Sequence, residues 1–318
     1  MHVVVAEVWR GDFLESVHHG TLLAVGPDDE TVLSVGEVDR PLYPRSANKP
    51  LQALGMLRSG LDLDGDLLAL ACASHSGEAF HLDGVRRILA RAGLDADALQ
   101  CVAGLPIGEA ALRSHLAGGG GPTRLTMNCS GKHAAMLATC VANGWDTTAY
   151  LDPCHPLQQA LRATIEDLTG EKVSATGIDG CGAPLFAFGY RGLARAFAKL
   201  ATGAPGSLER RVAQAMTEHP EFVGGTGRDV TRLMRALPGS VAKDGAEGVL
   251  VMALPDGSCI ALKIADGSVR ARPVVMIAAL RHLGIAAETN HTLAELATPP
   301  VLKHGQPVGA IHPARTLQ

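Results

Sequence analysis

The distribution of apolar positions predicts strands at the two ends of the chain and helices between them. Short runs rich in Val, Ile and Leu are typical of strands, and turn sequences such as Pro27-Asp28-Asp29 join neighbouring runs into hairpins. Strand-like runs occupy residues 2–9, 21–25, 31–36, 248–254 and 259–264. Apolar positions at helical spacing occupy residues 50–58, 81–92, 132–143, 157–168, 185–200, 208–218, 229–237 and 273–283.

This order of elements differs from the strand–helix alternation of a doubly wound parallel sheet. We therefore expect an α+β protein with an antiparallel sheet built from N- and C-terminal strands and with a helical middle. The expected organisation is one domain over residues 1–318. In it, strands within 1–45 and 245–318 share one sheet, and residues 46–244 form the helical region.

Composition narrows the class of protein. The chain has 318 residues, of which 47% are hydrophobic and 19% charged, as in folded proteins. Its net charge of −4 supplies no basic field, so nucleic acid is not an expected partner. No apolar run approaches the roughly 18 residues of a membrane span, and the first residues lack the pattern of a secretory signal. We expect a cytoplasmic protein without a membrane partner.

Lysine is the informative residue type, because the chain has seven lysines against 21 arginines. An ammonium group can lose its proton and act as a base, whereas a guanidinium group does not. Ser46 and Lys49 form a Ser-x-x-Lys motif at the start of a predicted helix, with both side chains on one face. Lys49 could activate the Ser46 hydroxyl as a nucleophile; alternatively, Ser46 caps the helix and Lys49 is solvated.

Two further segments complete a pattern of hydroxyl–lysine, hydroxyl and lysine-x-glycine. Lys243 opens Lys243-Asp244-Gly245 just before a predicted strand, and Ser74 follows a short apolar helix. Lysine-x-glycine on a strand accompanies Ser-x-x-Lys in penicillin-recognising enzymes. A simple turn at Lys243 and a polar loop around Ser74 are the alternatives.

The segment Asn128-Cys129-Ser130-Gly131-Lys132-His133 opens another predicted helix. Cys129, Lys132 and His133 are spaced to face one point. Together with Cys181, two thiolates could hold a zinc ion. Against this, the sequence has no C-x-x-C pair, and buried cysteines often serve as small hydrophobic residues. The odd number of cysteines, seven, favours free thiols, metal ligands or a nucleophile over disulfides.

Taken together and in this order, the motifs resemble those of the rhizobial-type L-asparaginases, a class that shares the fold of serine β-lactamases and glutaminases. The resemblance spans most of the chain. The segments that carry it are Arg45-Ser46-Ala47-Asn48-Lys49-Pro50, Cys72-Ala73-Ser74-His75-Ser76, Asn128-Cys129-Ser130-Gly131-Lys132-His133, Asp179-Gly180-Cys181, His219-Pro220-Glu221, Gly227-Arg228 and Lys243.

The resemblance implies hydrolysis of the side-chain amide of L-asparagine to L-aspartate and ammonia. It implies two hydroxyl–lysine tandems in one site, Ser46 with Lys49 and Ser74 with Lys243. We favour Ser46 as the nucleophile, because its lysine shares its helix face. Lys243 would then favour a neutral Lys49 by like-charge repulsion, and Ser74 would relay a proton.

The same resemblance implies a zinc ion held by Cys129, Lys132 and Cys181, which tunes substrate binding and does not perform the hydrolysis. Asp179 would contact the substrate or a metal-bound water, and Arg45 and His133 are further candidate substrate contacts. A homodimer is the expected assembly, from the fold analogy and the apolar composition.

Two other functions fit parts of the pattern. One is a β-lactam or D-alanyl peptide hydrolase, which shares Ser-x-x-Lys and Lys-x-Gly but acts outside the cytosol. The other is a catalytically silent module that binds an amino acid or zinc.

Overall fold

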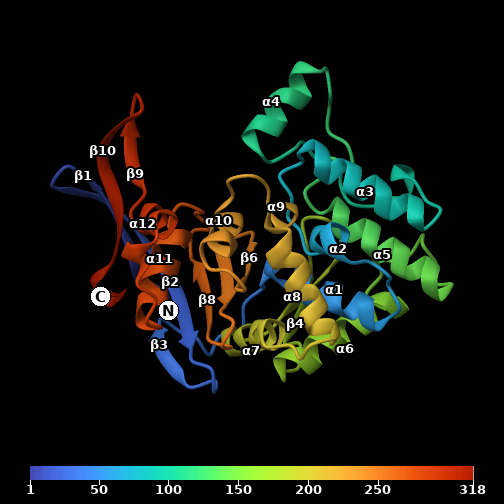
Figure 1. The fold of residues 1–318 in the computed structure, drawn as a ribbon, viewed down its shortest axis with the longest axis horizontal. Coiled ribbons are helices and arrows are strands. Elements are labelled where there is room, and N and C mark those ends of the chain that lie inside the picture. Colours follow the sequence, from blue (N-terminus) through green and yellow to red (C-terminus); the bar gives the residue numbers. More distant parts are fainter. Residues whose placement is uncertain (318) are drawn as a thin grey trace.

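The fold places strands from both ends of the chain in one sheet, beside a body of helices. The structure is a computed structural model that describes residues 1–317. Figure 1 shows the early strands β1 and β2 beside the late strands β9 and β10, and the cyan and green helices α2, α3 and α5 on the far side of the molecule. This arrangement confirms the predicted α+β class, with an antiparallel sheet built from terminal strands and a helical middle.

The strands and helices have the following bounds. The strands are β1 (Val3–Arg10), β2 (Phe13–Val25), β3 (Thr31–Val35), β4 (Ala175–Ile178), β5 (Pro184–Ala187), β6 (Val241–Gly245), β7 (Val249–Ala253), β8 (Cys259–Ile264), β9 (Pro300–Lys303) and β10 (Gln306–Pro313). The α-helices are α1 (Lys49–Arg58), α2 (Gly65–Ala71), α3 (Ala79–Arg91), α4 (Glu109–Ala117), α5 (Ser130–Asn143), α6 (Pro156–Thr169), α7 (Tyr190–Ala201), α8 (Leu208–Glu218), α9 (Pro220–Val223), α10 (Asp229–Ala236), α11 (Arg272–His282) and α12 (His291–Ala297). Short 3-10 helices are η1 (Arg45–Asn48), η2 (Ala96–Ala98), η3 (Ala287–Thr289) and η4 (Arg315–Leu317).

The main sheet runs in the order β6-β7-β8-β2-β1-β10-β9, and β3 also pairs with β2. All of these pairs are antiparallel; Lys243 lies opposite Val251, and Val8 lies opposite Ile311. Every residue of β7 is buried, and both α7 and α11 contact this strand and β8. Helices therefore cover both faces of the central strands, and β6 forms an edge of the sheet.

One predicted helix is wrong in its first part. Residues 185–200 were expected to form a single helix, but Pro184–Ala187 forms β5, which pairs with β4, and helix α7 begins only at Tyr190. All four residues of β5 are buried, and periodicity cannot distinguish a short buried strand from a buried helical segment. The separate hairpin β4–β5 carries Asp179 and Cys181 in its turn.

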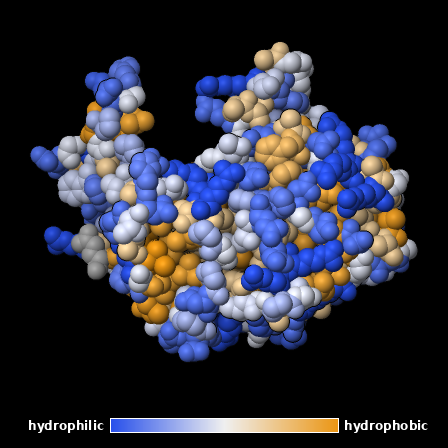
Figure 2. Space-filling model, viewed as in Figure 1, coloured by the Kyte–Doolittle hydropathy of each residue, from blue (hydrophilic) through white to orange (hydrophobic). Residues whose placement is uncertain are grey.

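Two elements lacked a hydrophobic pattern that could predict them. The first half of β2 is exposed along Phe13–Val17, so only its buried second half matched the expected strand. Helix α4 has no buried residue and lies outside the helical body (Figure 1). Because it packs no face against a core, its sequence needs no apolar stripe at helical spacing. Figure 2 shows a hollow between this α4 arm and the projecting β9–β10 ribbon.

Close packing between η1 and the end of β6 brings the sheet against the helical body. A Cβ atom at Gly245 would collide with the carbonyl oxygen of Pro44 and would lie 3.4 Å from the amide nitrogen of Ala47. Only glycine allows this approach. As a result, Ser46 in η1 and Lys243 in β6 lie on two elements in direct contact.

Among residues 1–317, no helix is both long and apolar enough to cross a lipid bilayer.

A glycine contact between α5 and α2 leads to a stability prediction. A Cβ atom at Gly131 would lie 2.5 Å from the carbonyl oxygen of Leu70, so Gly131→Ala must push α5 away from α2. We expect the free energy of unfolding to fall by about 1–3 kcal/mol, measured by chemical denaturation. Gly121→Ala is the matched control, because a Cβ atom there meets nothing within 4 Å. Equal stability of the two variants would show that α5 has room to move.

Candidate active site

Three of the seven lysines are buried in one region of the molecule. The exposed fraction is 1% for Lys49, 2% for Lys132 and 0% for Lys243. An ammonium group without partners is costly to bury, so each of these groups needs acceptors close by. Those acceptors define the candidate active site.

Lys49 lies at the start of α1 and joins three segments of the chain. Its Nζ atom lies 2.5 Å from the carbonyl oxygen of Ala73, 3.2 Å from Ser74 Oγ and 3.0 Å from Cys129 Sγ. Ala73 and Ser74 follow α2, and Cys129 caps the start of α5. Lys49 therefore contacts the hydroxyl of one predicted tandem and a thiol of the predicted metal site.

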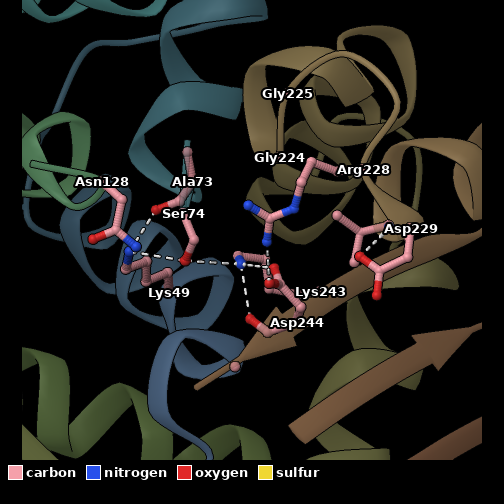
Figure 3. Close-up of polar contacts among 12 residues, drawn as sticks. Lys49, Ala73, Ser74, Asn128, Gly224, Gly225, Arg228, Asp229, Lys243 and Asp244 are labelled. Atoms are coloured by element: carbon pink, nitrogen blue, oxygen red, sulfur yellow. Dashed lines mark hydrogen bonds and ion pairs between the residues drawn. The ribbon is translucent and has the colours of Figure 1, made fainter. Parts of the chain in front are cut away.

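Ser74 lies between two lysines, as Figure 3 shows. Its Oγ atom is 3.2 Å from Lys49 Nζ and 3.1 Å from Lys243 Nζ. A hydroxyl group accepts from a protonated amine and donates to a neutral one. When one lysine is neutral and the other charged, Ser74 can accept from one and donate to the other. The arrangement is a path for a proton between Lys49 and Lys243.

Lys243 is the lysine whose neutral form is stabilised most clearly. Burial lowers its pKa to about 8, and the positive charges of Lys49 and Arg228 act in the same direction. The Asp244 carboxylate opposes them, because its Oδ1 atom lies 2.6 Å from Lys243 Nζ. Lys243 can therefore exchange a proton near neutral pH.

Asp244 connects Lys243 to two arginines. Its Oδ2 atom accepts a hydrogen bond from Arg228 at 2.7 Å and lies 3.6 Å from Arg272 Nη1, while Arg272 also pairs with Asp229 at 2.8 Å. Burial works to raise the pKa of Asp244, but the cations around it hold that pKa far below its usual value. Asp244 thus remains an anion beside Lys243 (Figure 3).

Sequence reasoning assigned no role to these neighbours of Lys243. Arg228 entered only as part of a motif, and Asp244 only as the middle of Lys-Asp-Gly. Successive side chains on a strand point to opposite faces, so their spacing does not predict the contact between Lys243 and Asp244. Arg272 and Asp229 carried no sequence signal that linked them to the site.

Ser46 lies in η1 with 9% of its surface exposed. Its hydroxyl makes no hydrogen bond within residues 1–317, and Lys49 Nζ points to Ala73 and Ser74 (Figure 3). The expected contact between Ser46 and Lys49 on one helix face is therefore not formed in this conformation. The segment Arg45–Asn48 is a 3-10 helix, in which residues follow a different spacing from that of α1.

Arg45 precedes Ser46 and pairs with Asp179 from the β4–β5 turn. Arg45 Nε lies 2.9 Å from Asp179 Oδ1, which also accepts the backbone N–H of Gly180 at 2.8 Å. Arg45 has a φ of 52°, a left-handed conformation that is uncommon for a residue other than glycine. The structure thus holds a cation and an anion, both partly exposed, next to Ser46.

Two thiols and Lys132 form a second buried cluster, the thiol cluster of Cys129, Lys132 and Cys181. Cys129 hydrogen-bonds to Cys181, and Lys132 Nζ lies 3.2 Å from Cys181 Sγ. The hydrogen bond from Cys129 lowers the pKa of Cys181 well below its usual value, and Lys132 adds to the effect. Burial alone would lower the pKa of Lys132, but the thiolates and Asp179 raise it above its ordinary value.

His133 lies behind this cluster and is fully buried. Its Nδ1 atom is 2.8 Å from Tyr150 Oη, and its buried Nε2 atom has no hydrogen-bond partner within residues 1–317. Burial lowers the pKa of His133. The structure therefore holds His133 against Tyr150, on the same helix as Lys132.

The thiol cluster offers two sulfur atoms and one amine as donors for a zinc ion. Sulfur and nitrogen atoms are preferred zinc ligands, and three protein donors leave a fourth position open. Within residues 1–317, no group of three His, Cys, Asp or Glu side chains could hold a metal ion. The cluster therefore reaches three donors only if Lys132 takes part as a neutral amine. With that condition, the residues present fit a zinc ion.

A comparison of the sequence with models of known protein families finds a match to one family. The sequence model of the L-asparaginase II family matches residues 6–313. No curated protein matches the chain. The match to the family covers the sheet, the helical body and all the residues of the candidate site.

Several solved structures are similar to this chain at low identity. A beta-lactamase from Mycobacterium bovis is 14% identical, with 78% of this chain and 88% of that chain covered and a TM-score of 0.43. EstCE1, described as a hydrolase with promiscuous acyltransferase activity, is 12% identical over 82% of this chain and 93% of its own, with a TM-score of 0.44. Mglu in its tris and glutamate form is 16% identical over 85% of this chain and 59% of its own, with a TM-score of 0.38.

The lowered pKa of Lys243 leads to a pH-dependent stability. Below pH 8 both the folded and the unfolded chain hold this proton, and the cost of burying the charge is fully present. Between pH 8 and 10.5 only the unfolded chain keeps the proton, so stability rises with pH. Over this pH range, we expect the free energy of unfolding of the wild type to rise by roughly 3 kcal/mol relative to that of Lys243→Met.

Chemical denaturation at several pH values measures this difference. Lys303→Met, which removes an exposed lysine on β9, is the control and should run parallel to the wild type. A Lys243→Met curve that also runs parallel would contradict the lowered pKa.

Proposed function

The chain belongs to the L-asparaginase II family, and from this premise we propose that it hydrolyses the side-chain amide of L-asparagine to L-aspartate and ammonia. Family membership makes the protein a hydrolase that acts on a small-molecule amide. The observation that carries the finer proposal is the position of Ser74 between Lys49 and Lys243. Ser46, whose hydroxyl makes no hydrogen bond within residues 1–317, lies on η1, which contacts both α1 and β6. This arrangement can take a proton from a serine and return it to a leaving group.

Ser46 is the nucleophile in the proposed mechanism. The Lys49 side chain first turns from Ala73 toward Ser46, a contact that this conformation lacks. Ser46 Oγ then attacks the amide carbon, and its proton passes to Lys49 as Lys49 gives a proton through Ser74 to neutral Lys243. The C–N bond then breaks, and the same path returns the proton to the nitrogen, which leaves as ammonia. Water attacks the resulting ester, the proton path works again, and L-aspartate is released with Ser46 restored.

Two features of the site support this assignment. Ser46 has more exposed surface than Ser74, at 9% against 4%. Ser46 also lies in the first turn of η1, where backbone N–H groups have no partner inside the helix and can stabilise an oxyanion. Ser74 is already held by two amines, which suits a relay better than a nucleophile.

Arg45 and Asp179 serve as the substrate's head-group contacts in this proposal. Free asparagine carries a carboxylate and an ammonium group on its α-carbon. Arg45 can bind the carboxylate and Asp179 the ammonium group, since the two side chains lie together with partial exposure. His133 stays a predicted contact whose observed hydrogen-bond partner is Tyr150.

We also propose that Cys129, Lys132 and Cys181 hold a zinc ion. The gathered thiols, the lowered pKa of Cys181 and the nearby amine support this proposal. When bound, the ion would supply a positive charge that strengthens substrate binding. Its link to catalysis is Lys49, which contacts both Cys129 and Ser74.

A homodimer in the cytoplasm remains our proposal for the assembly and location of the protein. Support for the dimer comes from the α4 arm, in which Leu116 is 51% exposed and the preceding Ile107 is 48% exposed. A helix with no buried residue gains little stability from its own chain. A second subunit could cover it.

Substitution of the serines tests the proposed nucleophile. Ser46→Ala should lower ammonia release from L-asparagine by at least about 10³-fold, with an unchanged melting temperature. Ser114→Ala, on the exposed face of α4, is the control and should retain full activity. Full activity of Ser46→Ala with loss in Ser74→Ala would move the nucleophile to Ser74.

L-glutamine has one more methylene and should react at least about tenfold more slowly.

Metal analysis of the purified protein tests the proposed zinc site. Equilibrium dialysis followed by elemental analysis should find about one zinc ion per chain in the wild type, since the proposal gives each chain one three-donor site. Cys181→Ser should lose this zinc and raise KM more than it lowers kcat. Cys154→Ser removes an exposed free thiol and should behave as the wild type. Equal zinc content in the wild type and Cys181→Ser would rule out the thiol cluster as the site.

A further inference from the structure

A large cavity next to the candidate site has no part in the mechanism above. Its volume is about 680 Å³, within the range of small-molecule sites. Arg45 lines it, but Ser46, Lys49, Ser74 and Lys243 do not. The cavity and the amide site therefore share Arg45 and are otherwise lined by different residues.

The cavity carries an excess of positive charge. Arg40, Arg45 and Lys263 line it, and its two carboxylates are Glu37 and Glu247. Glu37 is already paired with the amino group of Met1 and with Arg40. Glu247 is 62% exposed and lies 4.0 Å from Arg45 Nη1. Among the groups that line the cavity, three side-chain cations and the amino group of Met1 therefore outnumber two carboxylates, and Asp179, outside this lining, pairs with Arg45.

The effect of this charge is visible at Lys263 and His2. Burial lowers the pKa of Lys263; the Glu247 carboxylate opposes this shift, and the positive charge of Arg45 adds to it. Burial also lowers the pKa of His2, which Lys263, the amino terminus and Arg40 lower further. Like charges held together in this way favour an anion between them.

The remaining wall of the cavity is apolar and aromatic. Tyr43, Ile178, Leu185 and Tyr190 line it. A ligand that fits both parts is a small organic anion with a short carbon chain, and cations on three elements suit more than one carboxylate. Lys263 lies on β8 and Arg45 on η1. Arg40 lies in the segment before η1.

We propose that this cavity binds a small dicarboxylate at a site separate from the amide site. Lys263 and Arg40 provide charge that belongs to the cavity alone, and Arg45 is shared. A carboxylate that binds the guanidinium group of Arg45 competes with Asp179 for it. Occupation of the cavity therefore weakens the contact that positions the head group of the substrate, and by linkage substrate binding weakens dicarboxylate binding equally.

The consequence for turnover rests on the proposed function, whereas dicarboxylate binding does not. L-aspartate, the proposed product, is itself a dicarboxylate. It would act on the enzyme through this cavity in addition to the amide site.

Calorimetry with succinate, a dicarboxylate without an amino group, tests the binding directly. The Ser46→Ala protein is used, so that turnover plays no part. We expect saturable binding of succinate, weakened at least about tenfold by the added change Lys263→Met, the effect of losing one charge-assisted hydrogen bond. Lys303→Met, an exposed lysine outside the cavity, is the matched control and should leave binding unchanged. Absence of binding, or equal affinity in the Lys263 and Lys303 variants, overturns the proposal.

Arg40→Gln replaces Lys263→Met if the latter fails to fold, because the Arg40 side chain is 77% exposed and lines the same cavity. Inhibition of amide hydrolysis by succinate gives a second readout: KM should rise to a finite limit as succinate saturates, with kcat unchanged, and Lys263→Met should relieve the effect. Competitive inhibition that persists in Lys263→Met would place succinate in the amide site and contradict the proposal. Succinate binding that depends on Lys263, in a protein that hydrolyses no amide, would support the cavity and reject the proposed function.

Discussion

Three buried ammonium groups in one core are the constraint on which the rest of the structure depends. Lys49 finds its acceptors on the loop after α2 and at the start of α5, Lys132 finds a thiolate in the β4–β5 turn, and Lys243 finds Ser74 and Asp244. Apart from the contact between Lys243 and its neighbour Asp244, each contact joins segments that are distant in sequence. Loss of a partner would leave a charge unpaired in the interior, so the packing of these segments and the chemistry of the site are fixed together.

The charged groups around the site occur as pairs of opposite charge. In each pair, the proposed function has one side chain exchange this contact for another, with the substrate, a zinc ion or a proton. Asp179 holds Arg45 at the proposed head-group position, and the thiolate of Cys181 holds Lys132. Asp244 lies between Lys243 and Arg228, so it stabilises the protonated lysine while Arg228 limits that effect. Such a balance keeps Lys243 close to the point at which it can both accept and give a proton, which a relay requires.

Local patterns explain which parts of this molecule could be predicted from its sequence. The strand at Cys259–Ile264 and the helix Ser130–Asn143 have clear patterns, and the predicted residues Ser46, Lys49, Ser74 and Lys243 do lie on elements in contact. The strand β6 escaped prediction because Lys243 and Asp244 interrupt its apolar run, although both are buried. The contact of Lys49 with Cys129 and that of Arg228 with Asp244 depend on how distant elements pack, which no spacing along the chain records.

The position of β1 in the sheet has a consequence for how the protein is made. This strand begins at Val3, yet one of its two neighbours is β10, which ends at Pro313. During synthesis on the ribosome, β1 can pair early with β2, but its other edge must wait for β10, at the far end of the sequence. Lys243 likewise reaches Ser74 only after 169 residues of separation have been translated and closed into a loop. Folding is therefore expected to be slow, with strand edges that stay exposed in the meantime and that a chaperone can protect.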